Sequence, residues 1–218
     1  MIALEINKRS PKRESRRRAL EICIHLTDGS NETFIQPDAE TADNILRQTN
    51  PSLLFNQSRI VVADDYSKSV FICSQINRVD FAYEGYGFSY IPDDHADLVE
   101  LSEAEFRKHV PLDSPARLQK RRQHRRVGDL LVSFLNLRMR GGFHVYLMNE
   151  TLVKLPADSQ SYMQRLLSKN TFGIRLAGGG QGFVNLANLI SYTVYPGVAE
   201  VPADTWMVQP HGNYEKTH

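Results

Sequence analysis

The densest chemistry in the chain is a run of basic residues, Arg117–Arg126, which reads Arg-Leu-Gln-Lys-Arg-Arg-Gln-His-Arg-Arg. If this run is helical, its positive charges surround the helix, so several of them must point away from the protein body and repel one another. A nucleic acid would relieve that repulsion, because phosphates that bind the basic groups release their own counterions. The pattern predicts nucleic-acid binding at five positions: Lys120, Arg121, Arg122, Arg125 and Arg126.

An acidic block directly precedes this basic run. Glu84–Phe106 holds seven acidic residues and no Lys or Arg, whereas Arg107–Arg126 holds eight Lys or Arg and one Asp. Charge runs by themselves are weak evidence of function, so internal pairing of the two blocks and simple solvation are competing interpretations. In a further alternative, the charged segment recognises a partner protein, and the chain is then an interaction or assembly module.

The other candidate sites favour structural roles. Asp93–Asp97 could hold a divalent ion, but it lacks the glycine and the terminal glutamate of a calcium loop. Gly178–Gly182 joins two strand-like runs, whereas a phosphate-binding loop opens a helix, so we expect a hairpin turn there. Cys23 and Cys73 lie in strand-like runs and are expected to be inert core thiols. No catalytic residue, metal or cofactor is predicted. An enzyme with its site between two lobes, near Asp93–Asp97, is the weaker alternative to a non-enzymatic protein.

An internal duplication would position these residues. The tripeptide Asn-Glu-Thr occurs at Asn31–Thr33 and at Asn149–Thr151, each time between an alternating apolar strand and a run that ends in proline. Both segments read as strand, strand, helix, strand, strand. The predicted fold class is α+β, with two β-β-α-β-β lobes related by a pseudo-twofold axis and a charged, partly helical insert between them.

Local signals place the individual elements. Asp38 is expected to cap the helix of the first repeat, and Ser102 with Glu105 forms a capping box in the insert. The final strands of the first repeat should form a hairpin across residues 64–68. In the second repeat, a helix is expected over about residues 158–169. An extra strand should precede Phe143, although residues 130–137 fit a helical face as well as a strand.

The apolar positions of both repeats are predicted to be core, because a strand with a two-residue apolar period must bury one face. They are Ile22, Ile24, Leu26, Ile45, Leu46, Ile60, Ile72, Phe143, Val145, Leu147, Leu166, Leu167, Ile174 and Val184.

The 218 residues divide into five predicted segments. They are a flexible basic arm (1–18), the first repeat (19–82), the acidic-then-basic insert (83–128), the second repeat with its leading strand (129–195) and a polar tail (196–218). No apolar run is long enough to cross a bilayer, and the start lacks the apolar middle of a secretory signal. We therefore expect a cytoplasmic, non-membrane protein with a regulatory or accessory role.

Overall fold

The chain folds as an α+β protein built around one large sheet, in agreement with the predicted class. The structure is a computed structural model that describes residues 19–64, 66–83, 98–111, 130–152, 168–195 and 206. Among the described helices, none is long and apolar enough to span a membrane. The predicted basic arm and residues 158–167 of the helix predicted over about 158–169 lie outside these residues.

The N-terminal half, residues 19–83, contributes five strands and one α-helix. Its elements are β1 (Leu20–Leu26), β2 (Asn31–Gln36), α1 (Ala39–Gln48), β3 (Arg59–Ala63), β4 (Lys68–Ile72), the 3-10 turn η1 (Cys73–Gln75) and β5 (Ile76–Tyr83). The Asp38 carboxylate accepts a hydrogen bond from the Thr41 backbone N–H at 2.8 Å, which confirms the predicted helix cap. The expected hairpin across residues 64–68 is formed by β3 and β4.

The remaining described elements follow the charged insert or lie within it. They are β6 (Leu98–Leu101), α2 (Glu103–His109), β7 (Leu130–Met139), the turn η4 (Arg140–Gly142), β8 (His144–Leu152), β9 (Thr171–Arg175), β10 (Gln181–Asn185), the turn η5 (Leu186–Asn188) and β11 (Leu189–Tyr195). Residues 130–137 form a strand, because each of them pairs with β8. The capping box of Ser102 and Glu105 opens α2 as predicted.

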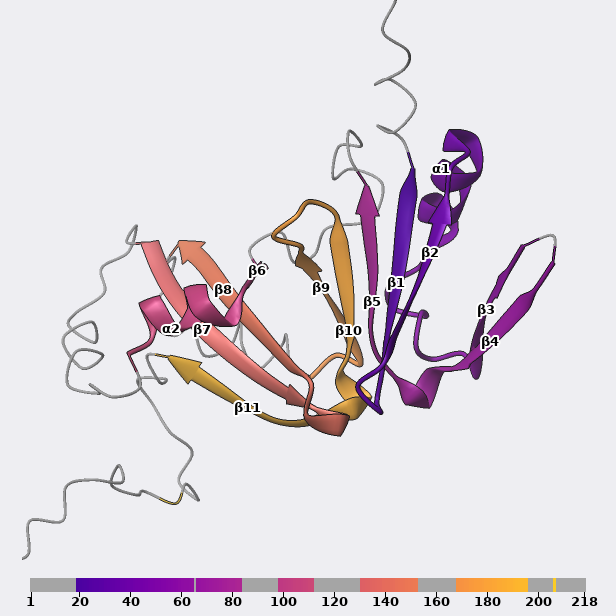
Figure 1. Ribbon diagram of the computed structural model, residues 1–218. Helices are drawn as coiled ribbons and strands as arrows, with labels where there is room; N and C mark the ends of the chain where they lie inside the picture. Colours follow the sequence, from indigo (N-terminus) through magenta and orange to yellow (C-terminus); the bar gives the residue numbers. More distant parts are fainter. Residues whose placement is uncertain are drawn as a thin grey trace, which may run out of the picture.

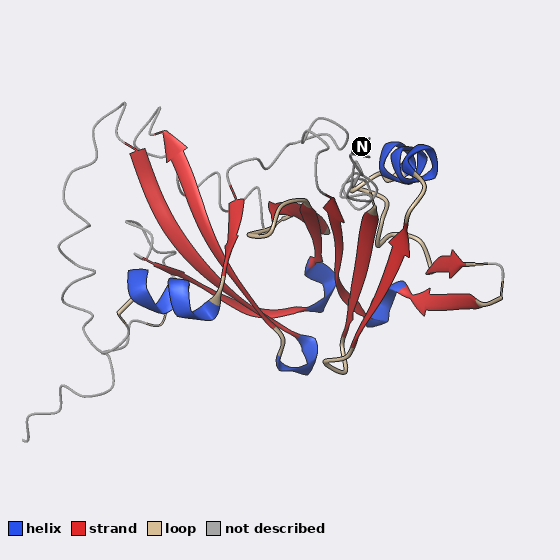
Figure 2. Cartoon of the chain, turned by 45° about the horizontal axis from the view of Figure 1, so that its top comes forward, coloured by secondary structure: helices blue, strands red, loops and turns tan. Residues whose placement is uncertain are grey.

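Nine strands form a single curved sheet in the order β11-β7-β8-β6-β9-β10-β5-β1-β2 (Figure 1). The two halves meet where β10 pairs with β5, and we call this contact the β5–β10 junction. The β3–β4 hairpin is a separate two-stranded sheet, and both views show it projecting from the body on the side of α1 (Figure 2). Strand β6 was not predicted, yet it joins the sheet between β8 and β9.

Two apolar cores lie on either side of the β5–β10 junction, and neighbouring residues of β10 point to different cores. Phe183 packs with Ile24, Leu46 and other residues of the N-terminal half, whereas Val184 packs with residues of the C-terminal half. A third cluster forms where Phe106 of α2 packs against β7 and β8.

Most described residues of the predicted core are buried or half-buried, and one is not. Ile72 is 52% exposed, because the inward-facing residue of β4 is its neighbour Phe71, which is 6% exposed. The run Val70-Phe71-Ile72 is apolar throughout, so its sequence could not indicate which face is buried. The predicted core residues Leu166 and Leu167 lie outside the described residues.

Buried asparagines tie the two halves together at the 3-10 turns. The Nδ2 atom of Asn185 donates to the carbonyl of Ile76 at 2.9 Å and to that of Cys73 at 3.1 Å. The Nδ2 atom of Asn188 donates to the carbonyls of Ile76, at 2.8 Å, and Ser74, at 3.2 Å. These bonds satisfy buried polar groups that would otherwise destabilise the fold.

The hairpins that open the two halves have the same register. Leu20 faces Gln36 across β1 and β2, and Ser133 faces Asn149 across β7 and β8, so corresponding residue numbers differ by 113. The predicted repeat matched Asn31 with Asn149 instead. That matching is wrong, because Asn31 is the first residue of β2, whereas Asn149 lies well inside β8 and Asn149–Thr151 forms no turn.

The same shift relates the ladders between the first and last strands of each half. The β1–β5 ladder and the β7–β11 ladder each contain a one-residue register shift at the equivalent position. Asn77 is left without a partner in the first ladder, and Ile190 is left without one in the second. Equivalent pairs are Ile22 with Phe81 and Leu135 with Val194. In both halves, a 3-10 turn separates the last two strands: η1 lies between β4 and β5, and η5 lies between β10 and β11.

Candidate functional site

A cluster of charged side chains is buried on the face of β5 that points toward the C-terminal half. Arg78 is 4% exposed and Asp80 is 7% exposed, and both alternate with the core residues of the same strand. Arg78 Nε lies 2.5 Å from Asp80 Oδ1, and Arg78 Nη1 lies 2.5 Å from Glu100 Oε1 on β6. His25 Nε2 of β1 lies 2.9 Å from Asp80 Oδ2. The cluster therefore links three strands that are distant in sequence.

The charges of this cluster support one another. Burial alone would raise the pKa of Asp80, but the hydrogen bond from His25 and the charge of Arg78 together lower it. Burial likewise opposes the positive charge of Arg78, yet Asp80 and Glu100 raise the pKa of its guanidinium above the usual value. Mutual pairing is the condition under which a buried charge is tolerated.

Nucleophilic catalysis at this cluster would need a side chain that His25 could activate as its general base. Cys23 faces Asp80 across the β1–β5 ladder, but burial raises the pKa of its thiol, and a weaker hydrogen bond with Thr33 only partly offsets that effect. The imidazole of His25 stacks on Phe143, with 5.3 Å between ring centroids. These contacts hold the side chains in place, so the cluster is best explained by a structural role, in which it fixes β1, β5 and β6 relative to one another.

The sequence contained a signal for this cluster that was not used. Arg78 and Asp80 occupy alternate positions of Ile76–Tyr83, a segment whose opposite face carries the large apolar residues Val79, Phe81 and Tyr83. Two charges on one face of such a strand indicate either an exposed face or a buried ion pair. Their partners His25 and Glu100 become identifiable only from the tertiary structure.

The glycine run next to this cluster has two roles. Residues 177–180 form the turn between β9 and β10, and Gly179 and Gly180 adopt positive φ values of 92° and 105°. Gly182 lies in β10 opposite Asp80, where a Cβ atom would lie 2.5 Å from Asp80 Oδ1. The hairpin expected from the sequence is confirmed, and Gly182 additionally leaves room for the buried carboxylate.

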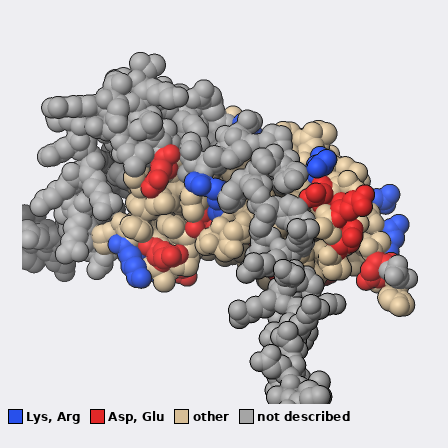
Figure 3. Space-filling view, turned by 90° about the horizontal axis from the view of Figure 1, so that it is seen from above, with Lys and Arg blue, Asp and Glu red and all other residues tan. Residues whose placement is uncertain are grey.

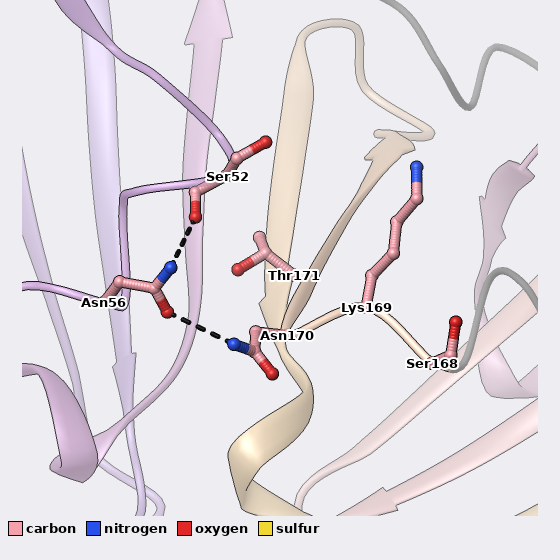
Figure 4. Close-up of a pocket in the computed structure, with 6 residues that line it drawn as sticks. All are labelled: Ser52, Asn56, Ser168, Lys169, Asn170 and Thr171. Carbon is pink, nitrogen blue, oxygen red and sulfur yellow. Dashed lines mark hydrogen bonds between the residues drawn. The ribbon is translucent and has the colours of Figure 1, made fainter.

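A polar hollow of about 370 Å³ lies where the loop after α1 meets the start of β9 (Figure 4). Asn170 Nδ2 donates to Asn56 Oδ1 at 3.4 Å, and Asn56 Nδ2 donates to the carbonyl of Ser52 at 2.8 Å. Thr171 Oγ1 is buried and has no hydrogen-bond partner among the described residues. Lys169 and Ser168 complete the described lining, which provides amides, hydroxyls and one amine but no carboxylate or imidazole.

The predicted nucleic-acid-binding residues Lys120, Arg121, Arg122, Arg125 and Arg126 lie outside the described residues, as does Asp93–Asp97. Three acids of the acidic block are described, and each has a partner. Glu100 binds Arg78, Glu103 binds Arg107, and Glu105 binds Ser102 in the capping box. Acidic and basic side chains both occur at each end of the described surface (Figure 3).

Metal and thiol chemistry find no support within the described part of the chain. No group of three or more His, Cys, Asp or Glu residues there could hold a metal ion. Cys73 is 2% exposed, and its burial raises the pKa of the thiol, as expected for an inert core cysteine. No protein-family model, curated protein or solved structure matches this chain.

Proposed function

We propose that the protein is a non-enzymatic regulatory or accessory protein that binds nucleic acid through Lys120, Arg121, Arg122, Arg125 and Arg126. One observation carries the proposal. Of the three described acids of the preceding block, Glu100 binds Arg78 of β5 and Glu105 binds Ser102 of its own capping box, so these two are engaged away from the basic run. Glu103 binds Arg107, which precedes the run Arg117–Arg126. Uncompensated arginines that follow one another closely are a binding surface for phosphates.

Binding of this kind is driven by counterion release. The logarithm of affinity falls with the logarithm of salt concentration, with a slope of about −0.9 for each phosphate neutralised on duplex DNA. The contacts involve the phosphate backbone, so affinity should depend little on base sequence.

The proposal is tested by replacing Arg121, Arg122, Arg125 and Arg126 together with alanine. At low salt, the parent should bind a fluorescent DNA or RNA duplex in an anisotropy titration, and the variant should not. Thermal stability should remain nearly unchanged, because exposed charges contribute little to folding.

The matched control removes four basic side chains from the described surface, namely Arg59, Lys108, Arg138 and Arg140, all of which are exposed. It loses the same net charge and should still bind. A parent that binds no duplex at low salt, or a control that loses binding as fully as the test variant, would overturn the proposal.

A second candidate function is that of a protein-interaction or assembly module. It is supported by the sheet, which leaves large apolar side chains exposed on strands that have an unpaired edge among the described elements, including Val70 on β4 and Tyr192 on β11. Exposed strand edges of this kind pair readily with other chains. In this function, the charged insert would recognise a partner protein instead of a nucleic acid.

We also infer that the two halves arose by internal duplication, with a different alignment from the one that the Asn-Glu-Thr tripeptide suggested. The supporting observation is the constant difference of 113 between corresponding residues of both ladders, together with the one-residue slip at the same place in each. A pseudo-twofold relation between the halves is part of this proposal.

A further inference from the structure

Four described strands lack a partner on one side: β11 and β2 at the two ends of the large sheet, and β3 and β4 in the hairpin. β11 is bonded to β7 alone, and β4 is bonded to β3 alone, among the described strands. An edge strand presents a row of backbone N–H and C=O groups that can pair with another strand. The edges of β11 and β4 lie at opposite ends of the molecule, with β11 to the left and the β3–β4 hairpin to the right in Figure 1.

The β5–β10 junction shows how these edges can be used. When residue numbers are shifted by 113, β4 corresponds to β10, and β11 corresponds to β5. The free edges of β4 and β11 are therefore the counterparts of the two edges that pair with each other inside the chain. The two halves already join through the pairing of β5 with β10. The equivalent pairing of β4 with β11 is not formed within the chain.

Burial at equivalent positions supports this relation. All five residues of β10 are buried, whereas three of the five residues of β4 are exposed. In β5, the residues from Asn77 to Asp80 are buried, whereas their counterparts in β11, Ile190 to Thr193, are all exposed. β4 and β11 are therefore more exposed to solvent than their counterparts β10 and β5, which bury each other at the β5–β10 junction.

Apolar side chains are concentrated on these strands. Five of the nine exposed large hydrophobic residues of the described chain lie on β3, β4 or β11: Val61, Val70, Ile72, Ile190 and Tyr192. Val61 and Val70 face each other across the hairpin and therefore lie on the same face of it. Covering such residues on association is favourable, at about 25 cal/mol for each Å² of apolar surface removed from water.

We propose that β4 of one chain pairs in antiparallel fashion with β11 of a second copy of this chain. The register of the β5–β10 junction, shifted by 113, gives the expected pairs: Lys68 with Val194, Ser69 with Thr193, Val70 with Tyr192, and Phe71 with Ser191. In this register, Val61, Val70 and Tyr192 share one face across three strands.

This contact is head-to-tail, because it joins two different surfaces. Each chain offers one β4 edge and one β11 edge, so the contact can repeat and generates a closed ring or an open filament. The outer edge of β2 is a poorer candidate. Its counterpart in the C-terminal half, β8, is bonded to β6 of the charged insert, so this edge has no contact between the two halves to serve as a template.

The first experiment measures assembly mass by analytical ultracentrifugation over a range of protein concentrations. The parent should form species larger than one chain, and Val70→Lys and Tyr192→Lys should each be single chains. Both residues are about half exposed, at 47% and 50%, so circular dichroism should show that each variant folds. Ile35→Lys is the matched control, since Ile35 is 67% exposed on the β2 edge, and it should assemble like the parent.

Mixing the two variants tests the head-to-tail geometry. The Val70→Lys chain keeps a working β11 edge, and the Tyr192→Lys chain keeps a working β4 edge. An equimolar mixture should therefore form two-chain species and nothing larger. A parent that stays a single chain at every concentration, substituted chains that assemble like the parent, or a mixture that stays dissociated would each overturn the proposal.

Cysteine pairing tests the register. Facing residues in an antiparallel pair have Cβ atoms about 4.5–5.5 Å apart. A Val70→Cys chain should therefore form an intermolecular disulfide with a Tyr192→Cys chain faster than with a Thr193→Cys chain, whose side chain lies on the opposite face. Equal rates would overturn the register. The proposal is independent of nucleic-acid binding, so the variant that lacks four arginines should assemble like the parent.

Discussion

At the scale of single residues, the buried cluster of Arg78, Asp80, Glu100 and His25 shows how charge can act as a positional constraint. Each member is useful only when its partners are present, because an unpaired buried ion is strongly destabilising. Since the partners come from β1, β5 and β6, the cluster fixes β6 of the charged insert against the N-terminal half.

Gly182 should be intolerant of substitution. In Gly182→Ala, the new Cβ would lie 2.5 Å from Asp80 Oδ1 and 3.0 Å from Leu176 Cδ2, so the buried carboxylate must shift. We expect a loss of about 1–3 kcal/mol in the free energy of unfolding, the usual cost of overpacking. Chemical denaturation measures it, and Gly178→Ala, which meets open space, is the control. Equal stabilities of the two variants would contradict the role given to Gly182.

Acid should weaken the protein partly through Asp80. Because the folded state lowers the pKa of this carboxyl, its stabilising contribution is fully present above the unfolded value of about 3.9 and is lost as the pH falls through the lower folded value. Asp80→Asn should cost about 3–5 kcal/mol at neutral pH, as expected when a buried ion loses its partner. Denaturation at several pH values should show the two proteins converging in acid. A difference in the free energy of unfolding between the parent and Asp80→Asn that stays constant as the pH falls would contradict the stabilising role given to the Asp80 carboxylate.

At the scale of elements, β1 is anchored in the N-terminal core by the apolar residues on one of its faces. Ile24 is fully buried in the N-terminal core, so Ile24→Ala should lower the free energy of unfolding by about 2–5 kcal/mol. Ile35→Ala on the neighbouring strand is the control, because Ile35 is 67% exposed and its truncation should cost less than about 0.5 kcal/mol. Urea denaturation of both variants checks the placement, and similar losses would argue against it.

Local signals predicted individual elements well. Asp38 and Ser102 cap the helices where the sequence placed them, because a helix cap depends on residues within one turn of the chain. The strand at residues 130–137 was ambiguous, since its leucines fit both periods, and pairing with β8 decided it. β6 has only four residues and was missed, because a strand that short has too little sequence to show a period.

At the scale of the whole molecule, the β5–β10 junction is the central feature. It merges the strands of two halves into one sheet and separates two apolar cores. The same arrangement leaves the equivalent edges of β4 and β11 open, which is the basis of the assembly proposal. Nucleic-acid binding would involve a different part of the chain, so the two activities can be separated by mutation.

The sequence by itself determined the α+β class, the two helix caps, the β3–β4 and β9–β10 hairpins, and most of the buried apolar positions. These features depend on residues close together in the chain, where periodicity and turn chemistry act directly. Tertiary structure alone decided the alignment between the halves, the partners of Arg78 and Asp80, the outward face of Ile72 and the pairing of β10 with β5. Such contacts join distant segments, and the two-residue apolar period of a strand indicates which face is buried but does not identify the strand with which it pairs.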